Sequence, residues 1–378
     1  MHKIVFAPDS FKGTMTSIQV CDILEKAFRK IKPGLETVKI PIADGGEGTV
    51  DAFLRAVGGE KIFVGTKNPL FEDIDSFYGI INNGKIAVIE MAAASGLPLI
   101  ENRKNPLDAS TFGTGLLIKD ALDRGCEKII LGLGGSATND GGIGIMAALG
   151  VKFLDKNMRE IIPSNRGLCD LKYIDGTGLD KRLKFCEITV ACDVDNILCG
   201  KNGASYVFGP QKGADENTVK ILDENLSRYA EILFEKTGRD VQNIPGTGAA
   251  GGVLASLLSF TDCKVCPGID IILDAANFDG IIKDADLIVT GEGKFDSQSL
   301  RGKVVSGIAK RAKKQNKPVV VIAGDVREYG EEVYDSDVLG IRAVFGVCSG
   351  VYTSFDEIRQ TCFEDLRRTG ENIARILW

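Results

Sequence analysis

Four glycine-rich loops that carry acidic or hydroxyl residues constrain this chain most, because each precedes a stretch that reads as a helix. They are Ala43–Gly48, Gly134–Gly142, Gly246–Gly252 and Thr290–Gly293. Three of them also follow a short apolar run, as a loop does at the end of a strand. Glycine allows tight turns, and a helix start offers unpaired N–H groups with a partial positive charge. The loops therefore predict alternating strands and helices with sites for anions, above all phosphate, where the two meet.

Both ends of the chain alternate between strand-like and helix-like patterns. The final helix is expected to begin at Ser354, because Glu357 completes a capping box. We predict an α/β fold with one Rossmann-like open parallel sheet of about six strands. The expected strands are 3–7, 37–42, 61–64, 287–290, 318–323 and 342–347.

The middle of the chain reads as an insertion into that sheet. Segments 76–81 and 85–89 predict a β-hairpin, because Asn82-Asn83-Gly84 joins them. A strand at 127–131 leads into Gly134–Gly142.

The length of the chain predicts two domains, since a single hydrophobic core stops growing near roughly 250–300 residues and this chain has 378. We expect a discontinuous Rossmann-like domain at 1–67 and 284–378. The second, mixed α/β domain is expected at 68–283, inserted into the first.

Composition narrows the classes of partner. Hydrophobic residues make up 44% and charged residues 26%, as in an ordinary soluble globular protein. The net charge is −6 and no block of lysine and arginine occurs, which argues against nucleic acid and anionic membranes as partners. No apolar run is long enough to span a membrane, and the N-terminus lacks a signal-peptide pattern. We expect a cytoplasmic protein and leave a homodimer open.

Histidine and cysteine usage excludes several catalytic designs. The single histidine is His2, at the extreme N-terminus, so Ser-His-Asp triads and histidine-ligated zinc sites are excluded. The ten cysteines are scattered through apolar segments and are expected to be reduced and mostly buried. The Cys263-x-x-Cys266 pattern has no second ligand pair, so we interpret it as structural.

The remaining chemistry fits phosphoryl transfer, which requires positioning, cations for the phosphates and a proton acceptor. No Walker A pattern occurs. Basic side chains beside the loops are Lys12, Lys212, Lys294, Arg301 and Lys303. Acids suited to Mg²⁺ or to base catalysis are Asp44, Glu47, Asp193, Asp195, Glu292 and Asp296.

Two other functions stay open on these residues. The pattern Gly246-x-Gly248-x-x-Gly251 matches the dinucleotide fingerprint, although 241–245 contains a proline and is a poor strand. It keeps an NAD(P)-dependent hydroxy-acid dehydrogenase as an alternative. Anion-binding loops alone would also suit a non-catalytic sensor of a phosphorylated metabolite, but such a sensor has no use for several acids beside them.

Taken together, the motifs resemble those of the type I glycerate kinases. The resemblance runs in order through 8–13, 43–48, 134–142, 191–196, 208–213, 246–252 and 290–303. It implies a Rossmann-like domain with a second α/β domain inserted, and the ATP-dependent, Mg²⁺-assisted phosphorylation of D-glycerate, usually to the 2-phospho product. Ile197 and Val305 stand where this pattern leads us to expect proline.

The resemblance and the shape of glycerate suggest which residues bind the substrate. Glycerate has one carboxylate and two hydroxyls, so its site needs a cation for the former and a carboxylate near the latter. Our hypothesis assigns the substrate's anionic group to Ser10 with Lys12 and to Arg301 with Lys303. Lys12 is also counted among the catalytic residues.

The acids and the glycine loops take the remaining roles. Asp193 is the first candidate for general base or Mg²⁺ ligand, Asp44 the next and Asp296 the third, and Glu292 is a further candidate for the metal. The expected contacts to the phosphates of ATP are Gly134, Gly135, Ser136, Thr138, Asn139, Gly246, Gly248, Gly251 and Gly252.

Overall fold

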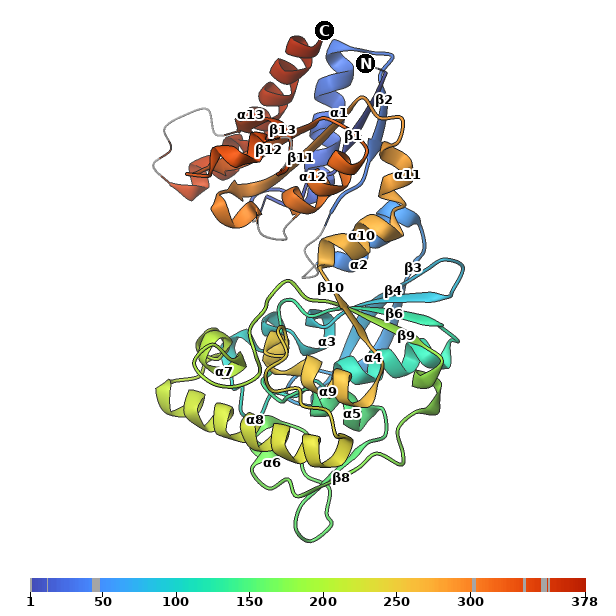
Figure 1. Cartoon of the computed structure of the whole chain (residues 1–378), viewed down its shortest axis with the longest axis vertical. Helices are drawn as coiled ribbons and strands as arrows, with labels where there is room; N and C mark the ends of the chain where they lie inside the picture. The colour runs from blue at the N-terminus through green and yellow to red at the C-terminus, as the bar shows by residue number, and fades with distance from the viewer. Residues whose placement is uncertain are drawn as a thin grey trace. The chain divides into compact units, whose positions relative to one another are not determined.

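The computed structural model describes residues 2–11, 13–42, 48–300, 304–335, 338–347, 352 and 354–378 (Figure 1). The chain forms two compact units. The first comprises Met1–Asp44, Arg55–Val57 and Ile269–Trp378, and the second comprises Gly45–Leu54 and Gly58–Gly268. This is the mixed α/β architecture with parallel sheets that the sequence predicts. The domain boundaries at 67/68 and 283/284 do not coincide with these divisions and remain a prediction.

The first unit is built on a parallel sheet of five strands in the order β13-β12-β11-β1-β2 within the described residues. Its strands are β1 (Lys3–Phe6), β2 (Glu36–Lys39), β11 (Leu287–Phe295), β12 (Val319–Val326) and β13 (Ile341–Gly346). Ile4 and Phe6 of β1 pack into one core with Leu24 and Phe28, because alternate residues of a strand face the same side.

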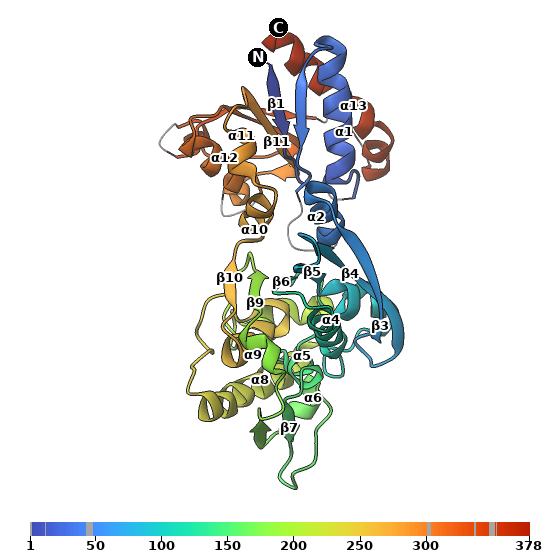
Figure 2. The same cartoon turned by 90° about the vertical axis from the view of Figure 1, so that its right-hand side faces the viewer.

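Helices cover both faces of this sheet. Helix α1 (Ser17–Ile31) packs beside α13 (Phe355–Leu377), and α12 (Val304–Lys314) contacts β11 on the other face, as Figure 2 shows. The start of α13 is as predicted, since the Ser354 hydroxyl accepts a hydrogen bond from the Glu357 amide. The two short helices α10 (Gly268–Ala275) and α11 (Phe278–Ile282) precede β11.

The second unit contains a six-stranded sheet in the order β10-β9-β6-β5-β4-β3. Strands β5, β6, β9 and β10 are parallel, whereas β3 and β4 pair antiparallel. The bounds are β3 (Glu60–Lys67), β4 (Asp73–Ile81), β5 (Ile86–Glu90), β6 (Lys128–Gly132), β9 (Glu187–Ala191) and β10 (Lys264–Cys266). A separate ribbon pairs β7 (Lys152–Leu154) with β8 (Tyr173–Asp175). The predicted hairpin is confirmed, with Asn82-Asn83-Gly84 all at positive φ.

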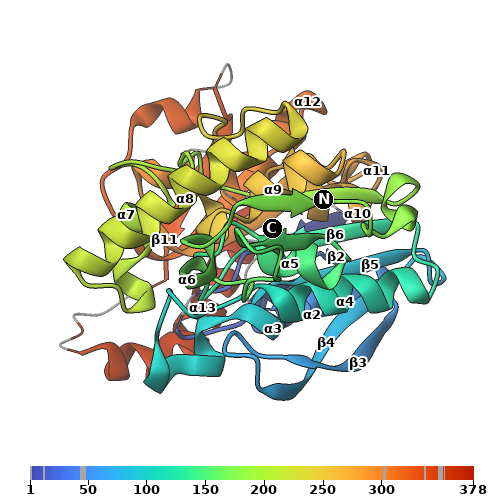
Figure 3. The same ribbon diagram turned by 90° about the horizontal axis from the view of Figure 1, so that it is seen from below.

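Most helices of the second unit are short. Helices α4, α5, α9 and α8 follow one another as packed neighbours, which Figure 3 shows from below. The helices are α2 (Thr49–Val57), whose last three residues are counted with the first unit, α3 (Ala92–Ser95), α4 (Phe112–Asp123), α5 (Ile143–Ala148), α6 (Asn165–Leu168), α7 (Ala204–Phe208), α8 (Glu216–Thr237) and α9 (Val253–Phe260). The 3₁₀ segments that bear on the site are η3 (Pro210–Lys212) and η4 (Ala249–Gly251).

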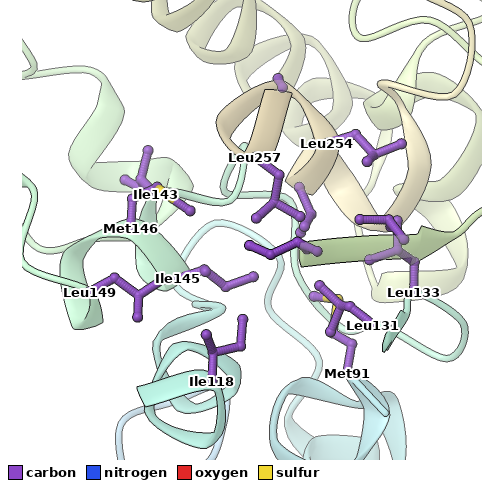
Figure 4. Packing of buried hydrophobic residues seen from close by; sticks show 14 of the residues in the cluster. Met91, Ile118, Leu131, Leu133, Ile143, Ile145, Met146, Leu149, Leu254 and Leu257 are labelled. Carbon is purple, nitrogen blue, oxygen red and sulfur yellow. The ribbon is translucent and has the colours of Figure 1, made fainter. Parts of the chain in front are cut away.

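The main core of this unit lies between its sheet and those helices. Figure 4 shows Leu131 of β6 and Met91, which follows β5, facing Ile118 of α4 and Leu257 of α9. Ile145 of α5 is also completely buried there. Burying such side chains is worth about 1.5–3 kcal/mol each, so this core fixes the carboxyl ends of the parallel strands.

Two sequence predictions are wrong about strands. Residues 61–64 do not form the third strand of the first sheet, since they belong to β3, which pairs with β4 of the second sheet at Phe63↔Phe77. A tight local turn explains the difference, because Asn68 Oδ1 accepts hydrogen bonds from the amides of Leu70 and Glu72. Such a turn joins β3 directly to β4.

The fourth expected loop is a strand. Residues 290–293 lie inside β11 and pair with β12, for example Gly291↔Ile322. A Cβ at Gly291 would lie 2.0 Å from the Ile322 carbonyl oxygen, so this glycine serves close approach between strands.

No helix among the described residues has the length and apolar character needed to cross a membrane.

Candidate active site

The carboxyl ends of four parallel strands form one edge of the sheet in the second unit. Their last residues lie in register, with Glu90 of β5 beside Gly132 of β6, Gly132 beside Ala191 of β9, and Ala191 beside Cys266 of β10. Ligands of open α/β sheets bind outside this end of the strands. We call the segments that follow these four residues the rim of the second unit.

The first glycine loop, Gly134–Gly142, leaves β6 at this rim. Gly135 is exposed and Gly134 is half-buried, whereas the rest of the loop is buried. The amides of Gly134, Gly135 and Ser136 donate to no acceptor within the described part of the chain. Gly135 has φ +74°, a conformation that favours glycine. The exposed start of the loop therefore offers backbone donors to an external anion.

The far end of the first glycine loop is capped from inside. Asp140 is completely buried and accepts hydrogen bonds from the amide (2.8 Å) and hydroxyl (2.8 Å) of Thr111 and from the amides of Gly142 (3.1 Å) and Gly144 (3.2 Å). Burial raises the pKa of Asp140, and these hydrogen bonds oppose that rise. The start of α5 is therefore occupied by the chain's own carboxylate.

A buried lysine lies behind the same loop. Lys212, on η3, is 2% exposed, and its ammonium donates to the Thr138 carbonyl at 2.6 Å and to the Ser136 hydroxyl at 3.0 Å. Burial lowers the pKa of Lys212 to about 7, while the negative charge of Asp140 acts in the opposite direction. The sequence marked Lys212 only as one of several basic residues near loops, because its partners lie 74 and 76 positions away.

Buried side chains from other helices fix the middle of the loop. The Asn165 amide of α6 donates to the Asn139 carbonyl at 2.8 Å, and the Ser205 hydroxyl of α7 donates to Asn139 Oδ1 at 3.1 Å. Asn225 of α8 supports Asn165 at 2.9 Å. These hydrogen bonds restrain the loop, although Asn139 Nδ2 is buried without a partner among the described residues.

The second glycine loop, Gly246–Gly252, lies directly against the first. The Gly141 amide donates to the Gly251 carbonyl at 2.9 Å, and a Cβ at Gly251 would lie 2.1 Å from the Thr138 carbonyl oxygen. The Gly248 amide donates to the Asn196 carbonyl at 2.8 Å. Apart from half-buried Ala250, this loop is buried. Its glycines therefore allow backbone to pack against backbone.

The structure removes the support for a dinucleotide fingerprint at this second loop. Residues 241–248 form turns, and no strand leads into Gly246. The fingerprint requires a strand before the glycines and a helix whose start faces the pyrophosphate. The pattern therefore gives no reason to prefer a dehydrogenase.

Asp193 lies at the rim, two residues beyond Ala191, as Gly134 lies two residues beyond Gly132. Its side chain is exposed, and Oδ1 accepts a hydrogen bond from the Gly268 amide at 2.9 Å. The structure thus brings Asp193 and the exposed start of the first glycine loop to adjacent strand ends.

Glu90 is a rim residue that the sequence interpretation missed. It is buried, and its carboxylate accepts hydrogen bonds from the amides of Val50 at 2.6 Å and Gly48 at 3.3 Å. Burial raises its pKa. Glu90 therefore caps α2, at a helix start that we expected to bind an external anion. Its place as the last residue of an apolar strand was the signal that could have found it.

The first unit has a separate group of polar residues at the ends of its own strands. The Asp9 amide, just after β1, donates to the Gly291 carbonyl of β11 at 2.8 Å, which brings Asp9 beside Glu292. Both acids are 8% exposed. Ser10 follows, and its amide donates to Asp9 Oδ1 at 2.6 Å. Asp9 was missed as a site residue, although it lies directly after a buried strand.

Asp296 also lies in the first unit, where its carboxylate pairs with the Lys294 ammonium at 2.8 Å. Five other candidate residues lie outside the described residues, namely Lys12, Asp44, Glu47, Arg301 and Lys303.

The acids of the described ranges do not form a ready-made metal site. No group of three or more histidine, cysteine, aspartate or glutamate side chains there could hold a metal ion. Mg²⁺ in phosphoryl-transfer sites uses one or two carboxylates together with substrate phosphates and water. A single exposed carboxylate, such as that of Asp193, is therefore compatible with Mg²⁺ that arrives with a nucleotide.

Comparison with known proteins gives one consistent family. Residues 4–378 match the glycerate kinase family. The protein called "Glycerate kinase" in Halalkalibacterium halodurans is 46% identical over 375 residues, covering 99% of this chain and 98% of that protein. "Glycerate 2-kinase" of Escherichia coli K12 is 46% identical over 376 residues, with 99% and 98% covered.

A solved structure extends this similarity to the fold. A crystal structure from Salmonella typhimurium LT2 matches with a TM-score of 0.89 and 44% sequence identity, covering 100% of this chain and 98% of that one. The chain belongs to the glycerate kinase family and is a kinase.

Proposed function

We propose that this enzyme transfers the γ-phosphoryl group of ATP to D-glycerate and forms 2-phosphoglycerate rather than 3-phosphoglycerate. The observation that carries this proposal is the similarity to "Glycerate 2-kinase" of Escherichia coli, which runs through 99% of the chain at 46% identity. The rim of the second unit supports it, because the exposed glycine Gly135 and the exposed acid Asp193 follow neighbouring strand ends there.

The exposed start of the first glycine loop is our proposed contact for the phosphates of ATP. The amides of Gly134, Gly135 and Ser136 would donate to phosphate oxygens, as backbone nests do. We propose that the second glycine loop acts indirectly, since its Gly248 amide already donates to the Asn196 carbonyl. It holds the first loop and the segment that follows Asp193.

Asp193 is proposed to act on the hydroxyl of glycerate. That oxygen attacks the γ-phosphorus while the bond to the β–γ bridging oxygen breaks, and ADP leaves. The hydroxyl proton would pass to the Asp193 carboxylate. A positioned base contributes about 10²–10⁴ in rate.

Magnesium, when bound with the nucleotide, neutralises charge on the phosphates. Asp193 in the second unit is a proposed protein ligand, and Glu292 in the first unit is kept as a separate candidate. Asp193 therefore has two candidate roles, as base or as metal ligand. Ser10, beside Asp9 in the first unit, remains our candidate for binding glycerate, together with Lys12, Arg301 and Lys303.

A coupled ADP-release assay tests the proposal. ADP production should require both Mg²⁺ and D-glycerate, and L-glycerate is the matched control. The product is then identified by ³¹P and ¹³C NMR, which distinguishes phosphate on the 2-hydroxyl from phosphate on the 3-hydroxyl. No glycerate-dependent ADP would remove the proposed activity, and a 3-phospho product would correct its regiochemistry.

Thermal unfolding separates the kinase from the dehydrogenase alternative. Mg-ATP should raise the melting temperature, because ligands that bind only the folded state stabilise it. NAD(P)H should leave it unchanged. Protection by NAD(P)H alone would contradict the assignment of the glycine loops to ATP.

A further inference from the structure

Lys212 is the most unusual charged side chain of the second unit. It is the one buried lysine within the described ranges, at 2% exposure. Lysine is almost never fully buried unless it is paired. Its two acceptors, the Ser136 hydroxyl and the Thr138 carbonyl, both belong to the first glycine loop and flank Ala137.

The contacts of Lys212 lie next to the part of the loop that faces outward. Ser136 adjoins Gly135, the exposed residue with φ +74°. From the other side, the Ala137 amide donates to the Ser95 carbonyl at 2.9 Å. The segment 136–138 is therefore held between Ser95 and the Lys212 ammonium.

The positive charge of Lys212 also acts on the loop electrostatically, in addition to its hydrogen bonds. Its ammonium hydrogen-bonds Ser136 and Thr138, next to the amides that we propose as phosphate donors, and a low dielectric strengthens the field of a buried charge. Asp140 is the charged group that acts on it, and Asp140 uses its hydrogen bonds on Thr111, Gly142 and Gly144. Ser136 and Thr138 are neutral.

We propose that Lys212 is a positioning residue for phosphoryl transfer. It fixes the Ser136–Thr138 segment from the buried side and makes the amides of Gly134, Gly135 and Ser136 a stronger site for the nucleotide's phosphates. Lys212 does not touch the reacting atoms in this proposal. The part that concerns the nucleotide rests on the proposed function, whereas the fixing of the loop does not.

The burial of Lys212 adds a dependence on pH with a defined sign. Its folded pKa is lowered to about 7 from 10.5. Between these values the unfolded chain binds more protons than the folded protein, so this group makes folding more favourable as pH rises through that range. The positive charge is fullest below pH 7, so its contribution to nucleotide binding should be largest there and fade above it.

The test compares Lys212→Met with Lys220→Met, an exposed lysine on α8 that serves as the matched control. Methionine keeps an unbranched apolar side chain and removes the charge. Without ligand, hydrogen exchange of amides 134–139 should become faster in Lys212→Met and stay unchanged in Lys220→Met. Unchanged exchange in Lys212→Met would overturn the fixing of the loop.

Kinetics then test the effect on the nucleotide. In Lys212→Met the KM for ATP should rise about tenfold or more at pH 6.5, the size expected when hydrogen bonds from a charged group to the loop are lost. The difference in KM between the variant and the wild-type enzyme should be smaller at pH 8.5. The variant's kcat should change less than its KM. A faster-exchanging loop with an unchanged KM, or a change in KM that is the same at both pH values, would overturn the proposal.

Ser136→Ala keeps the proposal testable if Lys212→Met does not fold. This variant removes one acceptor of the ammonium and keeps the charge. It should raise the KM for ATP by roughly two- to fivefold without altering its pH dependence, and wild-type KM with wild-type exchange would contradict the proposal. Failure of the proposed function is seen separately, as wild-type enzyme that releases no ADP with D-glycerate.

Discussion

The two glycine loops of the second unit have similar compositions and opposite environments. Gly134–Gly142 is half-buried at Gly134 and exposed at Gly135, and Lys212 holds it from the buried side. Gly246–Gly252 is buried almost throughout and fits between the first loop and the segment after β9. The first loop presents backbone N–H donors, whereas the second loop packs against backbone carbonyls of the first loop and of the segment after β9.

The difference teaches how glycine-rich segments should be interpreted. Glycine at Gly135 is needed for a positive φ, and a Cβ there would meet a side-chain carbon at 3.1 Å. Glycine at Gly251 is needed because a Cβ would lie 2.1 Å from a backbone oxygen. The surroundings of the missing side chain, rather than the number of glycines, distinguish a ligand loop from a packing loop.

The largest expected effect concerns the acid beside the exposed loop. Asp193→Asn should lower kcat by about 10²–10⁴ and leave the melting temperature unchanged, because the asparagine carbonyl can still accept from the Gly268 amide. Steady-state kinetics with D-glycerate and Mg-ATP measure this. Near-wild-type turnover would remove Asp193 from the chemistry and break the link between rim position and function.

A substitution in the packing loop should act on folding. Gly251→Ala should lower the free energy of unfolding by about 3–5 kcal/mol, since it combines a left-handed backbone with a clash against the Thr138 carbonyl. Gly238→Ala is the matched control, because Gly238 has φ +71° with nothing within 4 Å of its added Cβ. The control should lose only about 1–2 kcal/mol. Equal losses in urea denaturation would show that the close packing of the two loops is not what Gly251 provides.

A substitution in the exposed loop should cost less stability than Gly251→Ala and should act mainly on nucleotide binding. Gly135→Ala should cost about 1–2 kcal/mol of folding free energy from its positive φ. Its KM for ATP should rise while kcat changes less, because the added strain displaces the donors of the loop. If the KM for ATP stayed at the wild-type value, the proposal that the exposed loop binds ATP while the buried loop only supports it would be contradicted.

The sequence predicted regular elements well where the pattern was local. The hairpin at Asn82-Asn83-Gly84 and the capped start of α13 at Ser354 were confirmed, since each depends on a few adjacent residues. The strand at 61–64 was placed in the wrong sheet, because the choice between neighbours depends on the turn at Asn68. The strand through 290–293 was missed because β12, its partner, comes later in the chain.

The site was harder to predict because its contacts join distant segments. The rim positions of Gly134 and Asp193 could be expected from the rule that ligands collect at strand ends. The burial of Lys212 and the capping of α2 by Glu90 could not, since both depend on how far-apart segments pack. Sequence can suggest that a loop binds an anion, but it does not reveal that the helix start is already occupied by the chain's own acid.

The mutual fit of the two glycine loops sets a limit on engineering. Because Gly251 lies against Thr138 and Gly252 against Gly141, we expect each loop to depend on the other for its shape. Grafting residues 134–142 into another α/β scaffold would transfer an incomplete part. A transplant would need 246–252 as well, and substitutions tolerated during divergence at one loop should be matched by compensating changes at the other.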